Sequence, residues 1–147
     1  MTTIKIQNVS TKKNNGDRCE ENFDFAMNGY ISGKDSLAYD VASDVTHNGI
    51  GYSVKSSHFT LASAKLIHGE TLTEKLDYYF ARVHSTKAVY VANDNTAYIM
   101  NMTEFRSFLE VFATLERESE KNGGGMKVRC RTESKKMLNW LATQVAA

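Results

Sequence analysis

Two aspartates and a lysine stand close together where the sequence predicts a hairpin. The stretch YDVASDVTHNGIGYSVKSSHFTLAS contains Asp40, Asp44 and Lys55. Side chains two or four residues apart point to the same side of a β-strand. Asp40 and Asp44 are therefore expected on one face of the first strand, and Ser53 and Lys55 on one face of the returning strand. If the hairpin closes around His47–Gly49, the carboxylates face the lysine across the two strands.

Carboxylates that face a lysine suit the hydrolysis of a phosphodiester. A hard divalent cation such as Mg²⁺ or Mn²⁺ takes oxygen ligands, and one or two carboxylates together with substrate phosphate oxygens suffice to hold it. A lysine beside the metal-bound water could orient that water, help to deprotonate it, or stabilise the charge that develops on phosphorus. The alternative is an exposed hairpin in which these charges form solvated ion pairs that contribute little to stability.

The same residues resemble the core of the PD-(D/E)XK nuclease superfamily, which has the restriction-endonuclease-like fold. The motif of that family is an Asp on one strand and an (E/D)-x-K on the next, joined by a hairpin. The matching residues here are Asp40-Val41, Asp44-Val45, Ser53-Val54-Lys55 and His58. The resemblance implies a metal-dependent DNA endonuclease, with Asp44 as the principal metal ligand and Lys55 positioning or activating the attacking water.

One position departs from the family pattern. Ser53 stands two residues before the lysine, where the family has Glu or Asp, and a hydroxyl is a weaker, uncharged ligand. Asp40, or Glu20 or Glu21 on the first predicted helix, is the candidate for the missing carboxylate, because many members of the family carry a helical glutamate at the metal. By helical angle Glu20 lies nearer the apolar face than Glu21 and is preferred. The metal ligands implied by the resemblance are thus Asp44, Asp40 and Glu20.

Donor-bearing and basic side chains elsewhere suit contacts to a DNA backbone. Ser56, Ser57 and His58 directly follow the lysine and could contact phosphate oxygens; a polar strand end explains them equally well. In MKVRCRT the basic residues alternate about 7 Å apart along one strand face, a spacing that tracks phosphates and lets arginine reach guanine edges. The alternative for this strand is a solvated outer face that discourages edge aggregation. The basic residues are Lys127, Arg129 and Arg131.

The pattern of apolar residues predicts a mixed sheet flanked by helices, in the order α-β-β-α-β-β-α-β-α. The predicted helices span residues 18–30, 71–83, 103–121 and 134–145, the third capped by Thr103 and stopped by NGGG. The predicted strands lie at 36–46, 50–62, on both sides of a turn at 93–96, and at 126–132. This is an α/β class, and the nuclease resemblance adds the expectation of a restriction-endonuclease-like core.

Size and composition indicate one ordinary globular domain over residues 1–147. The chain is 41% apolar and 24% charged, with a net charge of +1. No apolar run approaches the roughly 20 residues that a membrane helix needs, and the N-terminus lacks the apolar core of a signal peptide, so we expect a cytoplasmic protein. Cys19 and Cys130 have neither metal-finger spacing nor the number of a disulfide scaffold, which favours buried free thiols.

The functional expectation is therefore a small Mg²⁺- or Mn²⁺-dependent DNA endonuclease. One protomer has room for one active site, so double-strand cutting would come most simply from a symmetric homodimer. A second hypothesis is a non-catalytic DNA-binding or regulatory protein on the same fold, whose acidic site has lapsed at Ser53. A third is a protein-interaction domain with an unrelated α/β architecture, which predicts no affinity for nucleic acid.

Overall fold

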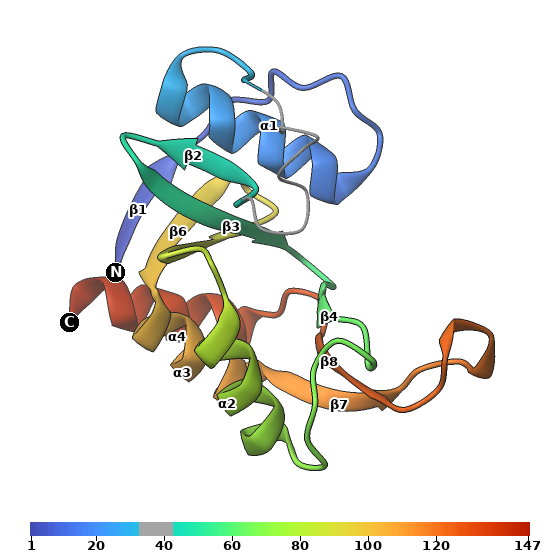
Figure 1. The fold of residues 1–147 in the computed structure, drawn as a ribbon. Coiled ribbons are helices and arrows are strands. Elements are labelled where there is room, and N and C mark those ends of the chain that lie inside the picture. Colours follow the sequence, from blue (N-terminus) through green and yellow to red (C-terminus); the bar gives the residue numbers. More distant parts are fainter. Residues whose placement is uncertain (33–42) are drawn as a thin grey trace.

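A five-stranded mixed sheet forms the centre of the protein in the computed structural model, which describes residues 1–32 and 43–147 (Figure 1). The strand order is β1-β6-β5-β3-β2. In that order the strands are β1 (Thr2–Lys5), β6 (Thr96–Asn101), β5 (Lys87–Val91), β3 (Ile50–Ser56) and β2 (Val45–His47). Strands β3 and β5 pair in parallel, and the other neighbours pair antiparallel. The predicted α/β class and the mixed sheet are confirmed.

A smaller antiparallel sheet lies beside the main one and has the order β4-β8-β7. Its strands are β4 (Thr60–Ala62), β8 (Met126–Cys130) and β7 (Ala113–Arg117). The sequence predicts one strand over residues 50–62, whereas the structure divides this stretch between β3 and β4. The chain turns at His58, whose φ of 68° lies in the left-handed region, and this turn transfers the chain from one sheet to the other.

Four helices cover the two faces of the main sheet (Figure 1). They are α1 (Asn15–Asn28), α2 (Leu72–Arg82), α3 (Met102–Phe112) and α4 (Lys135–Ala146), and a short 3₁₀ turn, η2 (Glu120–Asn122), lies between β7 and β8. Among the described elements, helix α1 lies on one face, and the other three helices lie on the opposite face. Each face of the sheet therefore has its own apolar core.

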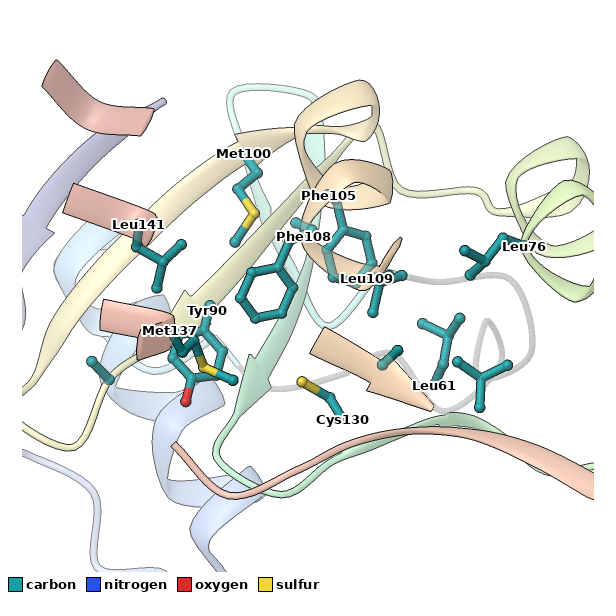
Figure 2. Close-up of a cluster of buried hydrophobic side chains, with 14 of the residues drawn as sticks. Leu61, Leu76, Tyr90, Met100, Phe105, Phe108, Leu109, Cys130, Met137 and Leu141 are labelled. Atoms are coloured by element: carbon teal, nitrogen blue, oxygen red, sulfur yellow. The ribbon is translucent and has the colours of Figure 1, made fainter. Parts of the chain in front are cut away.

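The larger core lies between the main sheet, the small sheet and helices α2, α3 and α4 (Figure 2). Phe108 is at its centre, fully buried, with its ring centroid 5.5 Å from that of Tyr90 and 6.0 Å from that of Trp140. The smaller core joins α1 to the sheet, where the centroids of Phe23 and Tyr52 are 5.3 Å apart. Burying an apolar side chain of this size contributes roughly 1.5–3 kcal/mol. The smaller core, which contains Val45, Tyr52 and Val54, therefore holds the β2–β3 hairpin in place.

The turn of the β2–β3 hairpin agrees with the sequence prediction. His47 pairs with Ile50, which leaves Asn48 and Gly49 as a two-residue loop. Both loop residues have positive φ, 50° and 78°, as a type I′ turn requires and as Asn-Gly readily adopts. This turn sets the register in which Val45 pairs with Tyr52.

The prediction of one long helix over residues 103–121 is wrong in its second half. Helix α3 ends at Phe112, and the chain continues as β7, in which Ala113 pairs with Cys130 of β8. Its N-cap is Asn101, in a capping box with Glu104, and not Thr103. The NGGG segment lies between β7 and β8, where its three glycines have positive φ and Gly123 caps the 3₁₀ turn η2, so the segment ends η2 and not α3. Pairing with β8 is a long-range interaction that helical spacing cannot anticipate.

Both cysteines are buried free thiols, as predicted. Burial raises the pKa of Cys130 to about 11, and it also raises the pKa of Cys19. A thiol that stays protonated near neutral pH is a poor nucleophile and a poor metal ligand. The two cysteines therefore belong to the packing of the cores.

Candidate active site

Asp44 lies at the start of the β2–β3 hairpin and is tied to the opposite strand. Its Oδ2 accepts a hydrogen bond of 2.8 Å from the backbone N–H of Val54. Asp44 directly precedes β2, which begins at Val45, so it is not among the described strand residues, whereas the sequence predicts a strand over residues 36–46 that includes it. The bond to Val54 holds the carboxylate beside β3, where its charge acts on the pKa of Tyr79 of α2.

The alternation predicted for β3 is confirmed. Tyr52 and Val54 pack in the core beneath α1, which leaves Ser53 and Lys55 on the opposite face. Ser53 is buried, with 8% of its surface exposed. Lys55 is half-buried, and its Nζ lies 5.8 Å from the ring centroid of Phe59. Ser53 and Lys55 thus share one face of the hairpin, and Asp44 is bonded to the N–H of Val54 between them.

Tyr79 of α2 completes this group, and the sequence analysis did not include it. Burial raises the pKa of Tyr79 to about 12, a hydrogen bond with Ser53 acts in the opposite direction, and the negative charge of Asp44 raises the pKa further. The phenol is therefore protonated at neutral pH, and it is near enough to the hairpin for the Ser53 hydroxyl and the charge of Asp44 to act on its pKa. In the sequence, Tyr79 fits the apolar face of a helix. Helical spacing does not predict which residues of other elements its hydroxyl group will meet.

The described residues do not bring the three implied metal ligands together. Asp40 lies outside the described residues. Glu20 is on α1, which covers the opposite face of the sheet from Ser53 and Lys55 (Figure 1). Over residues 1–32 and 43–147, no group of three or more His, Cys, Asp or Glu side chains is arranged to hold a metal ion. The oxygen donors on the hairpin face are the carboxylate of Asp44 and the hydroxyl of Ser53.

The three residues after Lys55 point in different directions. Ser56 is buried against α1 and accepts a hydrogen bond of 3.0 Å from Asn15 Nδ2, so its hydroxyl is turned away from the hairpin face. Ser57 Oγ accepts a hydrogen bond of 2.8 Å from the backbone N–H of Glu133. His58 is exposed, and its Nε2 contacts the guanidinium of Arg129. The structure therefore leaves His58 as the most accessible of the three.

Lys127 and Arg129 of β8 and Arg131, which directly follows the strand, alternate outward as predicted, since Val128 and Cys130 are buried between them. Two of the three, however, are held by carboxylates of β7 and of the turn that follows it. Lys127 Nζ lies 3.4 Å from Glu118 Oε1, and Arg129 Nε lies 3.3 Å from Glu116 Oε2.

Arg131 is the most accessible of the three basic side chains. Its Nη2 lies 3.8 Å from Glu116 Oε2, but 63% of its side chain is exposed, against 19% for each of Lys127 and Arg129. The guanidinium group of Arg131 and the imidazole ring of His58 are therefore both exposed near the C-terminal end of β8.

Comparison of the chain with protein-family models, with curated proteins and with solved structures gives no significant match. The similarity to the PD-(D/E)XK nucleases therefore rests on the motif residues alone and stays a prediction. Within the described part of the chain, no helix is both long and apolar enough to cross a lipid bilayer.

Proposed function

We propose that the protein is a metal-dependent DNA endonuclease whose active site lies on the face of the β2–β3 hairpin that α2 covers. One observation carries the proposal: Ser53 and Lys55 share one face of β3, and Asp44 accepts a hydrogen bond from the N–H of Val54 between them. The hydroxyl of Ser53 and the charge of Asp44 both act on the pKa of Tyr79. A carboxylate, a hydroxyl and an ammonium group on one hairpin, together with the phenol of Tyr79 on α2, form a polar site bordered by packed aromatic rings. Such a site suits the binding of a phosphodiester and a hard cation.

The oxygen donors of the hairpin face match the preference of Mg²⁺ and Mn²⁺, although the described residues supply only one carboxylate. Both ions prefer oxygen ligands, and Mg²⁺ is commonly held by one or two carboxylates, with water and substrate phosphate completing the shell. Asp44 would supply the carboxylate and Ser53 a neutral oxygen, and the family resemblance assigns a second carboxylate to Asp40. When bound, the ion would polarise the phosphoryl group and lower the pKa of a coordinated water.

The residues of the chain would then act on charge and orientation. Hydrolysis forms a bond between a water oxygen and phosphorus and breaks one phosphorus–oxygen bond of the backbone, with a proton passing to the departing oxygen. Lys55 would position the attacking water and stabilise negative charge on the phosphoryl oxygens. Tyr79 remains a hydrogen-bond donor over the whole physiological pH range, so it can hold Ser53 or a phosphate oxygen.

DNA would approach along the edge of the molecule that carries His58 and Arg131. Both side chains are exposed. Contacts from such groups to phosphates set the position of the duplex without reading its sequence. Cutting of both strands would require two sites, which a symmetric homodimer in the cytoplasm would provide.

A non-catalytic DNA-binding protein is the second candidate. It is favoured by the position of Ser53, a buried, uncharged side chain where the nuclease motif has a carboxylate. On this alternative the hairpin face is structural, and His58 and Arg131 alone would contact DNA. The two candidates differ in whether a divalent metal leads to strand cleavage.

The test is cleavage of supercoiled plasmid by the pure protein with Mg²⁺, with Mn²⁺ and with chelator. Lys55→Ala and Asp44→Asn should each lower the cleavage rate by about 10²–10⁴-fold, the usual contribution of a positioned acid–base group. Lys121→Ala, which alters an exposed lysine in η2, is the matched control and should cleave like the parent protein. Cleavage that survives both active-site changes, or that needs no metal, would refute the proposal.

A further inference from the structure

A cavity of about 190 Å³ adjoins the candidate active site, and Tyr79 borders both. Tyr79 lines the cavity, and its phenol is also the group on whose pKa the Ser53 hydroxyl and the charge of Asp44 act. The rest of the lining comes from the end of β4 and the segment after it, and from the second half of α2 with its C-cap residue Val83. The side chain of Tyr79 would therefore separate a ligand group in this cavity from a phosphodiester bound at the hairpin face.

The lining of the cavity is aromatic and apolar, with a single cation. The guanidinium carbon of Arg82 lies 3.6 Å from the ring centroid of Tyr78, and its Nη1 also donates to the carbonyl oxygen of Tyr78 at 3.2 Å. Leu66 forms the outer lip and is 67% exposed, the largest exposure among the large apolar side chains of the described residues. The described lining holds no acidic side chain.

These features suit a nucleobase. Bases that are not paired stack on aromatic rings and on guanidinium planes, and arginine can at the same time attract the neighbouring phosphate. The cavity is smaller than the roughly 300–1,000 Å³ of sites that enclose drug-sized ligands, so it admits one ring system and excludes a base pair. Because Leu66 in the lining is exposed, a base can enter the cavity directly from solvent.

We propose that the cavity between Leu66, Tyr78 and Arg82 binds one unpaired base next to the scissile phosphate, so that the substrate is DNA with single-stranded character. This inference rests on the proposed function, because Tyr79 connects the cavity to the site at which the phosphodiester would be cut. It adds a substrate class to that function: a strand end, flap or gap in preference to an intact duplex.

The test measures binding in chelator, where no cleavage occurs, by fluorescence anisotropy of a labelled single strand and of the duplex of the same sequence. Stacking of one base corresponds to roughly tenfold in affinity or more, so the single strand should bind about tenfold more tightly than the duplex. Leu66→Trp fills the cavity and should remove this difference. Val111→Trp adds the same ring to an exposed apolar residue of α3 that does not line the cavity, and it should retain the difference.

Arg82→Gln provides a second variant at the opposite wall and should also reduce single-strand binding. Equal affinity for the two forms of DNA, affinity for neither, or unchanged single-strand binding by Leu66→Trp would each overturn the inference. The nuclease proposal fails separately. Metal-dependent cutting with no preference for single strands would support the nuclease and refute base binding in the cavity. A preference for single strands that Leu66→Trp removes, in a protein that never cleaves DNA, would support base binding and refute the nuclease.

Discussion

The carboxylate of Asp44 and the backbone N–H of Val54 are joined by a hydrogen bond of 2.8 Å. This bond fixes a charged side chain at the beginning of the hairpin to the strand that carries Ser53 and Lys55. It also satisfies an N–H in a strand whose Val54 side chain is buried. Asp44 therefore has a structural role that is independent of any metal, and substitutions can separate the two roles.

Replacing Asp44 in two ways should distinguish structure from chemistry. Asp44→Ala removes the acceptor for Val54 N–H and should lower the free energy of unfolding by about 1–3 kcal/mol, the cost of a buried unsatisfied donor. Asp44→Asn keeps an oxygen acceptor of the same shape and should cost less. Urea denaturation measures both. If the two variants are equally stable, the bond to Val54 contributes nothing measurable.

Alkaline pH should weaken the protein through Tyr79. Its pKa is raised from an ordinary value near 10 to about 12 in the folded state, so the folded state favours the neutral phenol. The resulting stability is complete below the unfolded pKa and is lost as the pH rises from about 10 towards 12. Tyr79→Phe cannot ionise, so its free energy of unfolding should fall less steeply over this interval.

Urea denaturation at several pH values between about 9 and 11 measures this slope for the parent protein and for the Tyr79→Phe variant. Burial and Glu133 also raise the pKa of Tyr90, and this contribution is present in both proteins, so only the difference between the two slopes reports on Tyr79. Identical slopes would mean that the phenol of Tyr79 is not protected from ionisation in the fold.

The cap of α3 offers a prediction on which sequence and structure disagree. Asn101 accepts a hydrogen bond of 2.7 Å from Glu104 N–H, and the Glu104 carboxylate accepts one of 2.9 Å from Asn101 N–H. Asn101→Ala should lower the free energy of unfolding by about 1 kcal/mol, a typical value for a lost N-cap. Thr103→Ala, at the cap predicted from sequence, should change it by less than about 0.5 kcal/mol. A larger loss at Thr103 in thermal or urea unfolding would contradict the observed cap.

Lys127 in β8 and Arg131 just after β8 should contribute differently to DNA binding. Arg131 is exposed, whereas Lys127 lies against Glu118 and is largely covered. Arg131→Ala should reduce the slope of log affinity against log salt by about 0.9, the value for one lost phosphate contact. Lys127→Ala should leave that slope unchanged and lower stability instead. Anisotropy titrations across roughly 50–200 mM salt give the slopes, and a reduced slope for Lys127→Ala alone would reverse the assignment.

The local part of this architecture could be read from the sequence. The two-residue turn at Asn48-Gly49, the helices α1, α2 and α4, and the strand at Met126–Cys130 all depend on signals within a few residues: capping side chains, positive-φ turn residues and apolar periodicity. For the same reason, the alternation that places Ser53 and Lys55 on one face of β3 was predictable. Short-range geometry determines these features, so they can be predicted without knowing which distant elements pack against them.

The tertiary structure decided what depends on partners distant in the chain. Residues 113–117 carry apolar positions compatible with helix or strand, and pairing with β8 makes them β7. Ser56 was expected at the site beside Lys55, but the covering of its face by α1 turns it towards Asn15. The meeting of Tyr79 with Asp44 and Ser53 requires α2 to pack on the hairpin, a contact that no spacing within the sequence specifies. Sequence periodicity determines which face a side chain occupies, and only long-range packing determines what lies opposite that face.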